Sequence, residues 1–205
     1  MSDPIPIARR SLARGAYHVI RQAQQSIIDA EVRASRLAIL RSFHHRLSTD
    51  PGTLTTDAFL AVADPEVLRS AIIIAARSRA DACDLQVRDP ATGNLLLVAH
   101  HGFRPDFLDY FAVVDASVPS ACGLALATGA PVLVDDVGTS PVFSHQPTRQ
   151  VVLSAGFHAV QSYPLLDEHG EILGMLSLHY RTPGLRDGHE VLVEAVARTM
   201  ARLGR

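Results

Sequence analysis

The strongest nucleophiles in the sequence are the thiols of Cys83 and Cys122. Cys122 falls near the start of a predicted helix, where the helix dipole can lower a thiol pKa and favour the reactive thiolate. A thiol-dependent enzyme is therefore one interpretation. The other is packing, because free cysteine is among the most buried residue types and Cys122 stands between the small residues Ala121 and Gly123. We prefer the second interpretation and predict no catalytic residue.

Three histidines lie in or beside predicted strands, at His100, His101 and His179. Histidine nitrogens ligate iron and other transition metals. Adjacent residues of an extended strand point to opposite faces, so at most one of His100 and His101 can join His179. Ordinary surface or core histidines are the preferred interpretation, and we predict no metal site. Two cysteines are also too few for a four-thiolate zinc cluster.

The common nucleotide-binding and hydrolase motifs are missing from the sequence. The chain contains no lysine, so it has no phosphate-binding loop of the type G-x-x-x-x-G-K. It also has no G-x-G-x-x-G after a predicted strand, no G-x-S-x-G elbow and no H-E-x-x-H helix. These absences argue against kinases, NTPases and the commonest hydrolases.

The elements that must position these side chains follow from periodicity and turn residues. Residues 83–88 alternate between apolar and polar types, which predicts a strand, followed by a turn at 89–94 and a second strand at 95–100. A second hairpin is predicted at 159–180 around a Gly-containing turn. Helices are predicted at 64–79, 105–111, 120–128, 146–155 and from about 187 onward, with a short strand at 131–135. An antiparallel sheet with helices covering one face gives an α+β, two-layer fold.

Residues 1–50 are predicted to form a helical arm that precedes a domain at 51–205. From Ile7 to Leu47 the chain has no proline and one glycine, and turn residues at 48–53 end the helix. Apolar residues recur every seven positions, at 20, 27 and 34 and again at 23, 30 and 37. This stripe is typical of a coiled-coil seam and predicts dimerisation through the arm. A helix that packs on its own domain explains the stripe equally well.

Composition and charge restrict the class of protein, its nucleic-acid binding and its localisation. The chain has 205 residues, of which 47% are hydrophobic and 20% charged, as in folded globular proteins. The net charge is -2, and residues 1–50 hold eight arginines against four acidic residues. Aromatic side chains for base stacking are nearly absent from that segment, so nucleic-acid binding is not favoured. No segment has the pattern of a membrane span or an export signal, so we predict a cytoplasmic protein without membrane contact.

Several short motifs occur in an order and spacing that resemble the GAF domain, a small-molecule-binding module of bacterial signalling proteins. They extend over about residues 60–203. The motifs are ACDLQVRDPATG at 82–93, VAHHGF at 98–103, SACGLALATG at 120–129, PVLVDDV at 131–137, QSYPL at 161–165 and GEILGMLS at 170–177. The resemblance implies a GAF-like six-stranded antiparallel sheet, with the terminal helices on one face and a ligand cavity under loops on the other.

GAF-like proteins bind different cofactors through different residues, which can be sought in the sequence. Some members bind haem through a histidine, which keeps haem as an alternative for His179. Others hold a bilin through a Cys next to a His, and no such pair occurs here. The Asn-Lys signature of cyclic-nucleotide-binding members is also missing. The resemblance therefore implies a small-molecule ligand without identifying it.

The resemblance also suggests which residues contact the ligand. The more polar face of the two central strands would be enclosed by a roof, and polar groups in such a pocket orient a ligand. The predicted ligand-binding residues are Gln86, Ser177 and His179 on the sheet, with Cys122, Tyr163 and Phe143 in the roof or wall.

These observations predict a non-catalytic, small-molecule-sensing regulatory domain. Ligand occupancy would be relayed through the terminal helices of a homodimer to a separate effector protein, because the sequence contains no output module of its own. A protein interaction module with a vestigial pocket is the first alternative. A thiol-dependent enzyme is the second, since one GAF-like group reduces free methionine sulfoxide with cavity cysteines, an arrangement that is not visible here.

Overall fold

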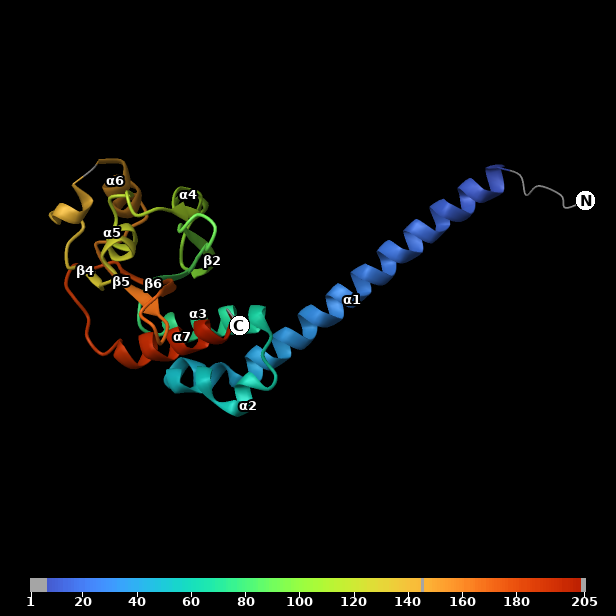
Figure 1. Cartoon of the computed structure of the whole chain (residues 1–205), viewed down its shortest axis with the longest axis horizontal. Helices are drawn as coiled ribbons and strands as arrows, with labels where there is room; N and C mark the ends of the chain where they lie inside the picture. Colours follow the sequence, from blue (N-terminus) through green and yellow to red (C-terminus); the bar gives the residue numbers. More distant parts are fainter. Residues whose placement is uncertain (1–6, 145, 204–205) are drawn as a thin grey trace, which may run out of the picture. The chain divides into compact units, whose positions relative to one another are not determined.

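The computed structural model describes residues 7–144 and 146–203, with side chains at 21–144 and 147–202 (Figure 1). The chain divides into two compact units after Ile39. In chain order the elements are α1 (Ile7–Thr49), η1 (Pro51–Thr55), α2 (Asp57–Leu60), α3 (Pro65–Ala76), β1 (Ala82–Arg88), β2 (Leu95–His101), α4 (Pro105–Tyr110), β3 (Val113–Val114), α5 (Ala121–Thr128), β4 (Val132–Val134), η2 (Pro141–Phe143), α6 (Gln146–Ser154), β5 (Ala159–Leu166), β6 (Ile172–Tyr180) and α7 (Glu190–Leu203).

The first unit contributes most of the helix α1. Its side chains from residue 21 to residue 35 are all exposed, and the apolar Ile27 and Leu37 are 60% and 52% exposed. The predicted stripe is therefore uncovered between positions 23 and 37, whereas the side chain at position 20 lies outside the described residues. Residues 1–6 of the predicted arm also lie outside them.

The second unit is built on a six-stranded antiparallel sheet with the strand order β3-β2-β1-β6-β5-β4. This arrangement confirms the predicted α+β fold. Both predicted hairpins are present, and the second turns where Asp167 accepts hydrogen bonds from the backbone N–H groups of His169 and Glu171. The strands β1 and β6 lie side by side in the centre of the sheet, where burial is deepest.

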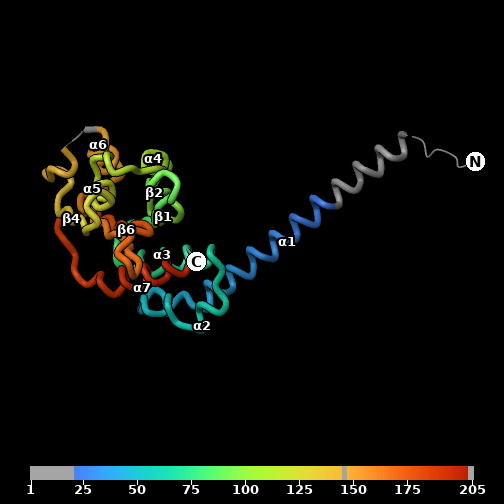
Figure 2. Tube along the Cα trace, viewed as in Figure 1, coloured from blue at the N-terminus to red at the C-terminus, as the bar shows by residue number. Residues whose placement is uncertain are grey.

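The helices α3 and α7 cover one face of the sheet, with η1 packed against α7 (Figure 2). α3 begins as its sequence predicts, because the Asp64 side chain accepts a hydrogen bond from the backbone N–H of Val67 and Pro65 takes the first helical position. The last turns of α1 belong to this unit, since Phe43 and Leu47 are buried there and the Phe43 ring lies 5.0 Å from that of Phe59.

The short helices α4, α5 and α6 lie over the other face of the sheet (Figure 1). α5 begins at Ser120, whose hydroxyl accepts from the backbone N–H of Gly123, and it ends at Gly129 with φ 67°. Glycine adopts this left-handed conformation without steric cost. The sheet thus has a long-helix layer on one face and a roof of short helices on the other.

Candidate functional site

A row of buried polar side chains crosses the centre of the sheet beneath the short helices. Asp84 on β1 lies opposite Ser177 on β6, and Ser177 lies opposite Ser162 on β5. All three residues are at most 5% exposed. Their common face follows from the two-residue repeat of each strand together with the register between strands.

Two hydrogen-bonded pairs hold this row together. The Nε2 atom of His179 lies 3.0 Å from Oδ2 of Asp84, and the hydroxyl oxygens of Ser162 and Ser177 are 2.9 Å apart. A carboxylate oxygen only accepts, so the bond places a hydrogen on Nε2 of His179. In the neutral ring, Nδ1 is then left as a hydrogen-bond acceptor.

Aromatic rings shield the His179 side chain. The rings of Phe103, Phe107 and Phe157 meet it edge to face or nearly so, with centroids at 4.9, 5.5 and 5.5 Å. Phe103 and Phe107 are stacked on each other at 4.2 Å. The Asp84–His179 pair is consequently buried beside aromatic rings, where its hydrogen bond is stronger than it would be in water.

Between the polar row and the roof lies a small cavity of about 20 Å³. That volume is enough for one water-sized group. Two side-chain acceptors in the lining, Oε1 of Gln86 and Nδ1 of His179, meet no hydrogen-bond partner among the described residues. The cavity is lined by Asp84, Gln86, Phe107, Phe111, Ser120, Ala121, Cys122, Phe143, Val152, Val160, Ser162, Ser177 and His179.

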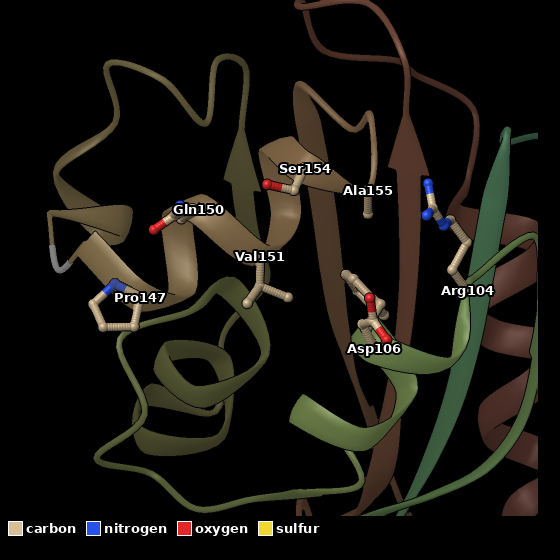
Figure 3. A pocket seen from close by; sticks show the side chains of 8 residues that line it. Arg104, Asp106, Pro147, Gln150, Val151, Ser154 and Ala155 are labelled. Carbon is tan, nitrogen blue, oxygen red and sulfur yellow. The ribbon is translucent and has the colours of Figure 1, made fainter.

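A larger groove of about 400 Å³ lies outside this cavity, between α4 and α6 (Figure 3). Pro147, Gln150, Val151 and Ser154 line it from α6, while Asp106 and Phe107 line it from α4. Phe107 therefore borders both the groove and the inner cavity. A hydrogen bond between the hydroxyls of Tyr110 and Thr148, 2.9 Å long, joins α4 to α6.

The sequence pattern of the whole domain settles the family. A family model described as the GAF domain matches residues 34–202. The chain belongs to the GAF domain family. GAF domains are a sensory and regulatory fold, and the polar row, its roof and the cavity lie within the matched region.

Solved structures show the same fold in distant GAF proteins. The GAF domain of a phosphoenolpyruvate-protein phosphotransferase from Coxiella burnetii is 19% identical, and the match covers 83% of this chain and 95% of that one with a TM-score of 0.53. The corresponding domain from Acinetobacter is 13% identical, with 82% and 94% covered and a TM-score of 0.53. Free methionine-R-sulfoxide reductase from Neisseria meningitidis, in complex with its substrate, is 15% identical, with 82% and 86% covered and a TM-score of 0.51. A comparison with curated protein sequences found no match.

Five of the six predicted site residues line the cavity of this GAF domain, namely Gln86, Ser177, His179, Cys122 and Phe143. Tyr163 does not line this cavity, because it follows Ser162 on β5 and so faces the opposite side of the sheet. Its hydroxyl accepts from Nε2 of Gln161 at 3.1 Å, and its ring lies 6.0 Å from that of His189 beside α7.

The prediction from sequence omitted several residues that the GAF domain brings into the cavity. Asp84 precedes Gln86 by two positions and shares its face, so the alternation of β1 already pointed to it. Ser162 and Phe107 carried no such local signal, because their places depend on the register of β5 and on the packing of α4.

Neither thiol is arranged for nucleophilic chemistry. Burial raises the pKa of Cys122 to about 12, although its sulfur lies 3.3 Å from the Ser120 hydroxyl at the start of α5. Burial also raises the pKa of Cys83 to about 12, on the face covered by α3. Desolvation thus outweighs the helix dipole at Cys122, and both groups are thiols at neutral pH.

The residues present do not fit a haem or a metal ion. In the part of the chain that the structure describes, no group of three His, Cys, Asp or Glu residues could hold a metal. His179 uses Nε2 for Asp84, and His100 and His101 are exposed at the end of β2. A cavity of about 20 Å³ is also far smaller than a haem. Within the described residues no helix is both long and apolar enough to cross a membrane.

Proposed function

We propose that this GAF domain is a non-catalytic regulatory module that binds a small molecule between the polar row of the sheet and the α4–α6 roof. The observation that carries the proposal is that two residues lining the cavity have buried acceptors without a partner among the described residues, Oε1 of Gln86 and Nδ1 of His179. A buried polar atom without a partner costs free energy, and native proteins normally satisfy such atoms. A bound ligand in the cavity would supply the missing donors.

A binding role is better supported than catalysis. The sulfoxide reductase from Neisseria meningitidis shares the fold and was solved with its substrate. The cavity of the present chain contains one thiol, Cys122, with a pKa of about 12, so its nucleophilic thiolate form is scarce at neutral pH.

The proposed output is a change in helix packing. α1 is continuous from the first unit to Thr49, and its last turns are anchored in the second unit by the buried Phe43 and Leu47. η1 follows directly and packs against α7. We infer that the terminal helices of a homodimer adopt two packing arrangements and that the ligand binds one of them more tightly. Ligand binding then favours that arrangement and changes the interaction with a separate effector protein.

A second function, a protein interaction module with a filled pocket, is favoured by one specific observation. The cavity has room for about one water-sized group, because the side chains of Phe107, Phe111 and Phe143 occupy the space beneath the roof. Under this alternative a single buried water would satisfy Gln86 and His179.

A native mass spectrum of the purified protein tests the proposed function. We expect a dimer, and we expect a discrete non-covalent additional mass that disappears on denaturation. Screening small metabolites by thermal shift extends the test to weakly held ligands, since a ligand that binds only the folded state raises Tm. A bare protein whose Tm no metabolite moves would contradict ligand sensing and favour the interaction module.

The proposed dimer predicts an asymmetry between two faces of α1. Ile27 lies in the seven-residue stripe, and Val32 lies on the opposite face of the helix, although both are exposed, at 60% and 42%. Ile27→Asp is expected to convert the dimer to a monomer, because it places a charge in an apolar seam. Val32→Asp is the control and should leave the dimer intact in sedimentation or light scattering. If both variants remain dimeric, the arm does not form the dimer interface.

A further inference from the structure

Three side chains in the lining of the inner cavity offer hydrogen-bond acceptors to a ligand. Asp84 contributes a carboxylate, Gln86 an unpartnered carbonyl oxygen and His179 an unpartnered ring nitrogen. Among the described residues that line the cavity, none is an arginine or a lysine. A ligand group that donates hydrogen bonds would satisfy both unpartnered acceptors.

The charge of the lining disfavours an anionic ligand. Asp84 is 5% exposed and already places a carboxylate at the cavity wall. A second negative charge beside it would have no compensating cation and would be repelled at low effective dielectric. A protonated amine has the opposite effect, because it brings up to three donors and a positive charge to a site that contains a carboxylate and two free acceptors.

The remaining walls suit a cation with a short apolar substituent. Phe107, Phe111 and Phe143 all line the cavity, and aromatic faces attract ammonium groups through the ring quadrupole. The volume of about 20 Å³ matches one small head group. Phe107 is the wall shared with the outer groove of about 400 Å³, so a substituent that displaces this ring gains space between α4 and α6.

We propose that the ligand of this GAF domain is a small primary ammonium compound, whose head group is bound by Asp84, Gln86 and His179 and whose apolar part lies against the phenylalanines. This inference rests on the proposed ligand-binding function and names the chemical class of the ligand.

Three probes of similar size and different charge test the inference: ethylammonium, ethanol and acetate. Their binding is followed by NMR through the backbone amides of β1 and β6, at constant ionic strength. We expect ethylammonium to shift these amides with a millimolar Kd, roughly what so small a ligand can reach. Ethanol should bind at least about tenfold more weakly, and acetate should not bind, because each lacks the charge or the donors.

A matched pair of variants separates binding from stability. Gln86 and Gln161 are both 1% exposed but lie on opposite faces of the sheet, and Gln161 makes hydrogen bonds to Arg186 and Tyr163. Gln86→Met is expected to weaken ethylammonium binding at least about tenfold and to raise Tm, since it removes an unpartnered polar atom. Gln161→Met should lower Tm and leave the Kd unchanged.

The other outcomes distinguish a failure of the ammonium inference from a failure of the proposed ligand-binding function. Binding of acetate, or of ethanol as tightly as ethylammonium, would overturn the charge inference while the ligand-binding function stands. Unmoved amides with every probe, together with a retained mass in the native spectrum, would also overturn the inference alone. If no probe binds, no mass is retained and no metabolite moves Tm, the proposed function fails as well.

Discussion

His179→Leu is expected to lower the free energy of unfolding of this GAF domain by about 3–5 kcal/mol, the usual cost of leaving a buried charge without its partner. The Asp84 carboxylate is 5% exposed, and its partner atom in His179 lies 3.0 Å away. Without the histidine, the buried carboxylate would lose this hydrogen bond, because the leucine that replaces His179 has no donor. Urea denaturation followed by circular dichroism measures the loss.

A double-mutant cycle shows whether the loss comes from the unpaired charge. Asp84→Leu combined with His179→Leu removes both polar groups, so the double variant should be more stable than His179→Leu alone. As a control, Ser162→Ala combined with Ser177→Ala removes a neighbouring buried pair in which neither group is charged, and its cost should be about 1–2 kcal/mol. If the losses at Asp84 and His179 simply add, the two side chains are not coupled in the folded protein.

Because His179 variants change stability so strongly, Gln86 is the better residue for binding tests.

The second large effect is expected at Gly174, where β6 passes the backbone of β1. A Cβ atom at this position would lie 2.2 Å from the carbonyl oxygen of Gln86 and 3.3 Å from the Cα of Val87. Backbone atoms in the middle of a sheet cannot rotate away, so the two strands would have to separate. We expect Gly174→Ala to cost at least about 3 kcal/mol, in the range of severe overpacking.

The control for Gly174 is another glycine of the same hairpin. Gly170 has φ +83°, and a Cβ atom added there would meet nothing within 4 Å, so Gly170→Ala carries only the cost of a left-handed backbone, about 1–2 kcal/mol. Urea midpoints of the two variants give the comparison directly. Equal losses would mean that the close approach of β6 to β1 is relieved by a small backbone shift. A larger loss at Gly174 would confirm that the close approach of β6 to β1 leaves no room for a side chain.

Local patterns in the sequence were sufficient to predict the longer helices, both hairpins and the family, but not β3, η1, α2 or η2. Alternation over residues 83–88, the β-prone run at 159–166, turn residues at 89–94 and 167–170, and the caps at Asp64 and Gly129 act over a few positions, so the chain shows them without its fold. The same alternation placed Gln86, Ser177 and His179 on one polar face. Rules that act over a few residues therefore predicted three of the sheet residues of the candidate site.

The contacts across the sheet, and the space that they leave, could be known only from the packed fold. Tyr163 and Ser162 are neighbours in the chain, and the register of β5 against β6 puts Ser162, not Tyr163, opposite Ser177. The convergence of three phenylalanine rings on His179 joins a helix and loops far apart in sequence. The cavity of about 20 Å³ is the small volume left after all these side chains pack. The size of this cavity depends on how all the surrounding side chains pack together, because protein interiors are packed as densely as organic crystals.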